Sequence, residues 1–342
     1  MVGSVSALAL VAALRDPSTT HTLDREGWTS LLTAARAERL MGALATRLDR
    51  RSAPAEVAAI LDDADAGAAH ERRGALWEAE MARRALVPLG CPVVLLKGTA
   101  FAAAGLDAGR GRAIGDLDIL VPRAALDAAE AALRAAGWEP VKADAYDDEY
   151  YRRWMHELPP LIHRARDRMI DVHHTILPTT ARPTPDAAAL IASAVPLGNG
   201  LAVLSPADMV VHAAAHLFAD GDLAGGLRNL WDIDRLCREF ADDDADFWTK
   251  LGARARLHGL VDAVGRALRL AADLYATPVP AAPHRRHPND AVYRRRLLAR
   301  DGWGRQTRPV TRLAFYVRSH WLRMPPHLLA RHLLVKAWRG RG

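Results

Sequence analysis

Residues 93–121, V-V-L-L-K-G-T-A-F-A-A-A-G-L-D-A-G-R-G-R-A-I-G-D-L-D-I-L-V, contain the pattern on which the expected fold depends. The stretch begins with the short apolar run 93–96 and ends with another, 117–121, and each is typical of a buried strand. Lys97, Gly98 and Thr99 follow the first run directly, so a cation and a hydroxyl stand beside a glycine that allows close approach to the backbone. This combination indicates a phosphate-binding turn, and we expect a helix between it and the second strand.

Two acids, Asp116 and Asp118, stand at the start of the second strand. Because side chains alternate across a strand, residues two apart lie on one face, roughly 6.6 Å apart along the chain. Two carboxylates on an otherwise apolar strand repel each other and are costly to bury, and a divalent cation removes both penalties. Both residues are therefore candidate metal ligands and catalytic acids. For so short a pattern, the alternative is a solvated strand edge or a helix N-cap.

The order of these motifs resembles the nucleotidyltransferase superfamily of DNA polymerase beta. Its members carry a Gly-Ser or similar turn, an Asp-x-Asp strand and a third acid on a later strand. Thr99 stands where the superfamily more often has Ser, and the turn lies further from the acids than in the smallest members. The resemblance implies two Mg²⁺ (or Mn²⁺) ions held by the acids, with an NTP, expected to be ATP, as substrate.

The third acid is expected on a hairpin further along the chain. Residues 158–163 and 169–176 are predicted to form two antiparallel strands joined by a polar turn, beside the acid-bearing strand. Asp171 and His173 fall on one face of the second of these strands, and Asp171 is the position that matches the third acid. The run D-V-H-H-T resembles a branch of uncharacterised bacterial nucleotidyltransferases, in which His173 would belong to the binding site. The alternative for His173 is a structural histidine.

Residues 205–236 extend the resemblance to the same branch. Ser205 is a candidate N-cap for a helix that carries His212 and His216 one turn apart. These two histidines have no evident third ligand, so a zinc site is not predicted. In the helix that follows, Arg228 and Asp232 match an Arg and an Asp of that branch. Arg228 either holds a phosphate or forms an ion pair with Asp232 on the helix surface.

The length of 342 residues exceeds one comfortable core and suggests two to three lobes. We expect a helical lobe at 1–90, a nucleotidyltransferase core at 91–204 and a helical lobe with a basic tail at 205–342. Two cysteines provide neither a disulfide framework nor a zinc site, which favours a reducing cytoplasm. Residues 1–14 are apolar but lack the basic start of a signal peptide, so we expect a helix there. No run is long enough to span a membrane, and stable membrane insertion is not expected.

Basic charge is concentrated at the C-terminal end of the chain. The net charge is +6, but residues 283–342 hold 15 Lys and Arg against two acids, whereas the remainder holds 31 against 38. The block 312–338 mixes arginine with large apolar residues and resembles the closing helix of the same bacterial branch. We expect it to pack on the core through the following residues: Phe315, Tyr316, Trp321, Leu322, Leu328, Leu329, Leu333 and Leu334. The alternative is an arm that binds nucleic acid.

Taken together, these features predict an α+β protein with a small mixed or antiparallel sheet, flanking helices, and helical lobes at both ends. The expected activity is the metal-dependent transfer of a nucleotidyl group, AMP if the NTP is ATP, to an acceptor hydroxyl or phosphate. The residues expected to bind the nucleotide are Lys97, Gly98, Thr99, Arg112, His173 and Arg228. The alternatives are a non-catalytic nucleotide-binding or regulatory module of a biosynthetic or toxin-antitoxin system, and an RNA-modifying enzyme that uses the basic tail. The acceptor, whether small molecule, peptide or RNA, is not determined by the sequence.

Overall fold

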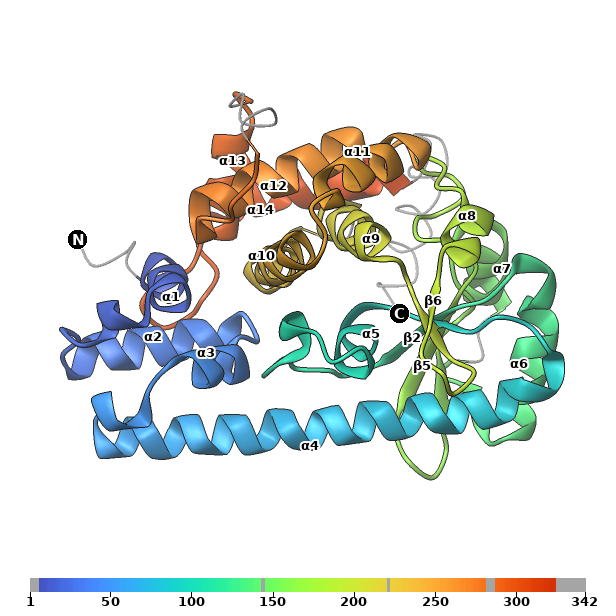
Figure 1. The fold of residues 1–342 in the computed structure, drawn as a ribbon, viewed down its shortest axis with the longest axis horizontal. Coiled ribbons are helices and arrows are strands. Elements are labelled where there is room, and N and C mark those ends of the chain that lie inside the picture. Colours follow the sequence, from blue (N-terminus) through green and yellow to red (C-terminus); the bar gives the residue numbers. More distant parts are fainter. Residues whose placement is uncertain (1–5, 143–144, 220–221, 281–286, 324–342) are drawn as a thin grey trace, which may run out of the picture.

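The computed structural model describes residues 6–142, 145–219, 222–280 and 287–323, and Figure 1 shows how they are arranged. Its α-helices are α1 (Ser6–Arg15), α2 (Arg25–Ala37), α3 (Met41–Arg47), α4 (Ala55–Leu86), α5 (Lys97–Ala103), α6 (Leu126–Ala135), α7 (Ala145–Trp154), α8 (Ala187–Ala192), α9 (Pro206–Ala219), α10 (Gly226–Asp243), α11 (Phe247–Leu257), α12 (Val261–Tyr275), α13 (Asp290–Leu297) and α14 (Pro309–Arg323). Its strands are β1 (Val94–Leu95), β2 (Leu117–Leu120), β3 (Trp138–Pro140), β4 (Leu161–His163), β5 (Met169–His173), β6 (Val195–Pro196) and β7 (Ala202–Val203).

The seven strands form one mixed sheet in the order β3-β4-β5-β2-β1-β7-β6. The pairs β2–β5 and β1–β7 are parallel, and the other neighbouring strands are antiparallel. All four residues of β2 are buried, which explains why its sequence is apolar apart from Asp118. The prediction of an α+β fold with a small mixed sheet and flanking helices is confirmed.

The register between β2 and β5 places the acids beside each other. Asp118 lies directly opposite Asp171 in the parallel pair. The β4–β5 hairpin was expected next to the acid-bearing strand, and it lies there, although both of its strands are shorter than predicted. Two strands that are distant in sequence thus bring two carboxylates to the same level of the sheet.

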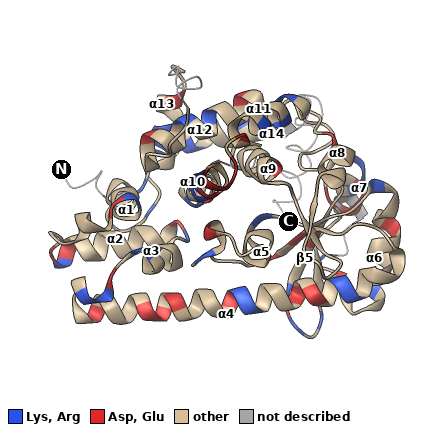
Figure 2. Ribbon diagram, viewed as in Figure 1, with Lys and Arg blue, Asp and Glu red and all other residues tan. Residues whose placement is uncertain are grey.

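Helices α1 to α4 make up the N-terminal part of the chain, where helices were expected. Asp24 caps α2 by accepting a hydrogen bond of 2.8 Å from the backbone N–H of Gly27. Helix α4 is the longest, and it runs beneath both the N-terminal helices and the sheet (Figure 1). Figure 2 shows acidic and basic residues interspersed along α4, which is typical of a helix with one solvated face.

Helices α9 to α12 pack together, and they lie on the opposite side of α5 from α4 (Figure 1). Ser205 caps α9, since its hydroxyl accepts a hydrogen bond from the N–H of Asp208 at 3.3 Å. The apolar faces of these helices and of the sheet join the N-terminal helices in one hydrophobic core. The helices therefore hold the ends of the strands in fixed positions relative to α9 and α10.

Residues 181–204 hold several prolines and glycines, yet they contain helix α8 as well as strand β7. Asp186 caps α8 by accepting a hydrogen bond from the N–H of Ala189 at 2.9 Å. Prolines and glycines are typical of loops, so the sequence of this segment does not indicate the six-residue helix α8.

The expectation for the basic C-terminal block is wrong in part. Phe315 of α14 is buried and stacks edge-to-face on Tyr293, with ring centroids 5.0 Å apart. However, Tyr316 is 44% exposed and Trp321 is 46% exposed, so neither is packed into the core. Helix α14 packs against α9 and against Tyr293 of α13, and these contacts leave Tyr316 and Trp321 largely uncovered. The expected core residues from Leu328 onward lie outside the described residues.

Within the described ranges, no helix is both long enough and apolar enough to cross a membrane.

Candidate active site

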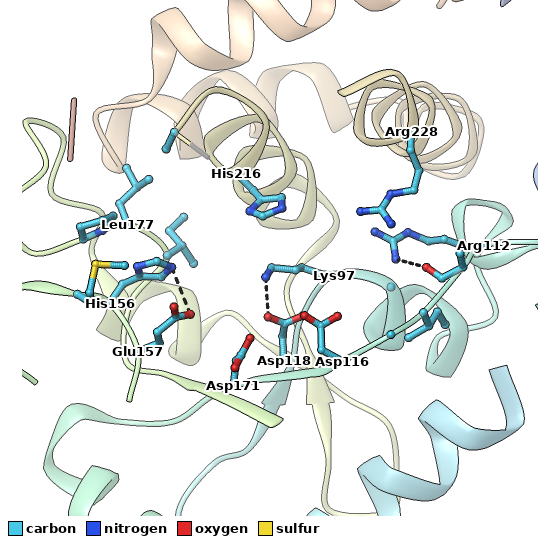
Figure 3. A pocket seen from close by; sticks show the side chains of 18 of the residues that line it. Lys97, Arg112, Asp116, Asp118, His156, Glu157, Asp171, Leu177, His216 and Arg228 are labelled. Carbon is cyan, nitrogen blue, oxygen red and sulfur yellow. Dashed lines mark hydrogen bonds and ion pairs between the residues drawn. The ribbon is translucent and has the colours of Figure 1, made fainter. Parts of the chain in front are cut away.

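Three carboxylates meet at one end of β2 and β5 (Figure 3). Asp116 immediately precedes β2 and is exposed, Asp118 is on β2 and is buried, and Asp171 is on β5. Each of the three offers an oxygen atom that lies within 4.8 Å of those of the other two. This is the convergence of acids that the sequence analysis proposed as a metal site.

Asp118 is held by two neighbours, the ammonium of Lys97 and the imidazole of His173. Lys97 Nζ donates a hydrogen bond to Asp118 Oδ1 at 2.5 Å, and His173 Nε2 lies 3.0 Å from the same oxygen. Burial alone would raise the pKa of Asp118, but the attraction of Lys97 and His173 outweighs burial and lowers the pKa well below its usual range. Asp118 is therefore ionised, and neither contact uses its second oxygen, Oδ2.

Asp171 has the opposite electrostatic environment. Burial, together with the negative charges of Asp118 and Glu157, raises the pKa of Asp171 to about 7. Its Oδ1 is buried and has no hydrogen-bond partner among the described residues. An ionised carboxylate in this position is unfavourable in free energy unless a cation binds it. The three acids therefore fit a divalent metal ion.

The predicted phosphate-binding turn is the first turn of α5. Lys97 begins the helix with φ +50°, a left-handed conformation that is uncommon for a residue with a side chain. A Cβ added to Gly98 would lie 2.0 Å from Nη1 of Arg112, so this glycine makes room for the arginine. Thr99 is only 1% exposed and is not one of the residues that line the cavity described next.

The acids open onto a cavity of about 430 Å³, a size typical of small-molecule sites. Arg112 and Arg228 lie on one side of the acids and face each other (Figure 3). Arg112 Nε donates to Asp232 Oδ2 at 2.9 Å, and both of these side chains are buried. The ion pair considered between Arg228 and Asp232 does not form, and Asp232 pairs with Arg112 instead.

The remaining arginines of the cavity lack acidic partners. Neither Arg39 nor Arg228 forms a salt bridge with any residue that the structure describes. Burial and the neighbouring Arg112 lower the pKa of Arg228. Arg39 and Arg228 thus carry positive charge that no ion pair with a described residue neutralises, and such charge favours an anionic ligand.

Several residues of the cavity were not found from the sequence. Arg39 follows α2 with φ +55°, and His156 and Glu157 precede the hairpin, in segments without a recognisable motif. On the side of the acids away from Arg112 the wall includes Leu177 (Figure 3), and the apolar Met155 also lines the cavity. His173, which was expected to bind the nucleotide, is 1% exposed and does not line the cavity. It contacts the site through Asp118.

The sheet, the flanking helices and the acids on adjacent parallel strands form a nucleotidyltransferase-like fold. The model of a family described as "Uncharacterised nucleotidyltransferase" matches residues 24–276. Because this match covers most of the chain, the protein belongs to that family. Membership indicates a transferase, and the acidic clusters are able to bind a metal ion. No curated protein matches the chain.

Proposed function

We propose that the protein is a metal-dependent nucleotidyltransferase that moves a nucleotidyl group from an NTP, with ATP the expected donor, to an acceptor hydroxyl or phosphate. Pyrophosphate is the leaving group. The observation that carries the proposal is the meeting of Asp116, Asp118 and Asp171 in a cavity whose opposite side holds arginines without acidic partners.

The acids would hold Mg²⁺ or Mn²⁺ through the oxygens that converge between β2 and β5. Bound there, the metal would neutralise phosphate charge and lower the pKa of the attacking hydroxyl. Lys97 and His173 keep Asp118 ionised and fix its carboxylate through Oδ1, which leaves Oδ2 for the metal. The buried Oδ1 of Asp171 gains in this way the partner that it otherwise lacks.

The arginines would bind the triphosphate. Arg112 is fixed by Asp232 at its Nε and donates from Nη1 to the carbonyl of Ala113 at 3.4 Å, which leaves Nη2 to donate hydrogen bonds toward a phosphate. Arg228 and Arg39 add two further cations on the same side. Hydrogen bonds from arginine to phosphate are charge-assisted and directional, so this side would orient the α-phosphate toward the acids.

The substitution Gly98→Ala is expected to weaken nucleotide binding at least about tenfold, the effect of losing one hydrogen bond to a charged group. The added Cβ would lie 2.0 Å from Nη1 of Arg112 and 3.2 Å from Cγ1 of Ile114, so the guanidinium must leave its position. Calorimetric titration with a non-hydrolysable ATP analogue and Mg²⁺ measures the effect.

The matched control for this substitution is Gly252→Ala on α11. An added Cβ there lies no closer than 3.7 Å to Nη1 of Arg256, an ordinary contact. Alanine is a better helix former than glycine, so the control should be as stable as the wild type or more stable, by up to about 1 kcal/mol. Equal nucleotide affinity in Gly98→Ala and Gly252→Ala would refute the role of Arg112.

Mg²⁺ binding should depend on pH through Asp171. Its pKa is raised to about 7, and metal ligands must be deprotonated, so Mg²⁺ affinity should fall as the pH decreases through about 7. An ordinary aspartate would give this decrease near about pH 4. Calorimetric titrations with Mg²⁺ across this range measure it, and an affinity that stays constant down to about pH 5 would contradict the assignment.

The same pKa shift predicts how Asp171→Asn affects stability. The folded pKa lies above the unfolded one, so the favourable contribution of protonated Asp171 is complete below about pH 4 and is lost as the pH rises through about 7. At about pH 8 without metal, Asp171→Asn should therefore raise the melting temperature. The variant should also lose the stabilisation that Mg²⁺ gives to the wild type.

A further inference from the structure

A second cluster of metal-ligating side chains lies beside the three acids, on the side away from Arg112. It consists of His156, Glu157 and His173 (Figure 3 labels the first two). Each offers one ligand atom, and these atoms lie within 4.8 Å of one another. The cluster contains two imidazoles and one carboxylate, whereas the Asp116 cluster contains oxygen ligands alone.

The backbone fixes the positions of all three residues. Glu157 forms an antiparallel bridge with His173 at the end of β5. On either side of this bridge, the N–H of Leu158 donates to the carbonyl of Val172 at 2.9 Å, and the N–H of His174 donates to the carbonyl of His156 at 2.9 Å. The three side chains therefore start from a hydrogen-bonded backbone frame, which a precise metal site requires.

The separations between the ligand atoms suit a tetrahedral ion. His173 Nδ1 lies 3.3 Å from Glu157 Oε2, and His156 Nε2 lies 3.6 Å from the same oxygen. Zinc bonds of about 2.0–2.1 Å to nitrogen and about 2.0–2.2 Å to oxygen place neighbouring ligand atoms of a tetrahedron roughly 3.3–3.5 Å apart. Both separations from Glu157 Oε2 therefore agree with a tetrahedral site to within a few tenths of an ångström, and the three ligand atoms all lie within 4.8 Å of one another.

The hydrogen bonding of His173 also fits a metal ligand. Its side chain is 1% exposed, and its Nε2 lies 3.0 Å from Asp118 Oδ1. Its Nδ1 points toward Glu157 but lacks the alignment of a hydrogen bond, and it has no hydrogen-bond partner among the described residues. When Nε2 donates its proton to Asp118, Nδ1 presents a lone pair, as in the carboxylate–histidine–metal arrangement of many zinc sites.

We propose that His156, Glu157 and His173 form a transition-metal site, with Zn²⁺ as the ion that best suits two imidazoles and a carboxylate. His156 and Glu157 line the cavity, so the fourth position of the ion faces the cavity and takes an oxygen ligand. The site is separate from the Mg²⁺ ligands Asp116 and Asp171, and the two sites are linked through the contact between His173 and Asp118. The competing explanation is an imidazolium of His173 held between two carboxylates, without a metal.

The test is titration of the full-length, chelator-treated protein with Co²⁺, which reports tetrahedral coordination by its visible absorption, followed by competition with Zn²⁺. We expect one ion per chain and displacement by Zn²⁺. His156→Ala and Glu157→Gln should each weaken binding by more than about 100-fold, because loss of a mere hydrogen-bond partner of a ligand already costs about 10–100-fold. Glu157→Gln keeps the side-chain shape, so it decides the question if His156→Ala does not fold.

Two controls locate the ion. His70 is exposed on α4, and His70→Ala should leave Co²⁺ binding unchanged, which excludes adventitious binding to surface histidines. Asp116→Asn removes a proposed Mg²⁺ ligand and should also leave Co²⁺ binding intact. No tetrahedral spectrum in the wild type, or an unchanged one in both His156→Ala and Glu157→Gln, would overturn the proposal. Loss of Co²⁺ binding in Asp116→Asn would place the ion among the aspartates instead and would equally overturn it.

Discussion

Replacing Asp116 with Asn is expected to abolish nucleotidyl transfer and to leave the melting temperature of the metal-free protein unchanged. Asp116 is exposed and forms no salt bridge with the described residues, so the fold does not depend on its charge. Binding of the proposed metal ion does depend on the Asp116 carboxylate, and losing this ligand should reduce Mg²⁺ affinity by more than about 100-fold. Calorimetry with Mg²⁺ and a thermal melt of the same sample measure both quantities.

Asp118→Asn and Asp242→Asn provide the comparisons for this result. Asp118 is 2% exposed, neutralises Lys97 and contacts Nε2 of His173, so Asp118→Asn should abolish transfer and also lower the melting temperature. Asp242 is exposed on α10, far from the acids in sequence, and its substitution should change neither quantity. A transfer rate in Asp116→Asn equal to that of Asp242→Asn would be incompatible with the proposed metal site.

Replacing Arg112 with Met is expected to destabilise the fold by about 3–5 kcal/mol, as is typical when one partner of a buried ion pair is removed. Arg112 and Asp232 are both buried, and burial raises the pKa of Asp232 even with the arginine present. Without the guanidinium, Asp232 is left as an uncompensated buried carboxylate. Urea unfolding of the wild type and of Arg112→Met measures the difference in the free energy of unfolding.

The double substitution Arg112→Met with Asp232→Leu separates stability from nucleotide binding. Exchanging a buried ion pair for apolar residues of similar volume is often neutral for stability, so most of the lost free energy should return. The affinity for the ATP analogue should not return, because the cation that faces the triphosphate is absent. Recovery of both properties would mean that Arg112 has a structural role alone.

Much of the fold was predictable, because the local sequence signals for strands, turns and caps agree with the elements that form. The strands at 93–96 and 117–121, the hairpin that carries Asp171 and the helix capped by Ser205 follow from apolar periodicity and capping chemistry. Helix α8 and the exposure of Tyr316 were not predictable, because short helices carry weak periodicity and burial depends on which face meets a neighbour.

The site was predictable to a smaller extent. The proximity of Asp116, Asp118 and Asp171 could be predicted, because strand periodicity and the resemblance to a family both applied to these residues. Ion pairs between residues that are distant in sequence could not be predicted. An example is Arg112 with Asp232, which are 120 residues apart. The same is true of His156 and Glu157, whose place in the cavity depends on a backbone bridge to β5 that has no local sequence signal.

Nucleotidyl transfer itself is tested most directly by the fate of two labels. The protein is incubated with Mg²⁺, an extract that supplies acceptors, and ATP labelled either at the α-phosphate or at the γ-phosphate. We predict that the α-label enters an acceptor and the γ-label enters pyrophosphate, and that both transfers are lost with EDTA and in Asp116→Asn. Transfer of the γ-label to an acceptor, or α-label transfer that persists in Asp116→Asn, would contradict the proposed reaction.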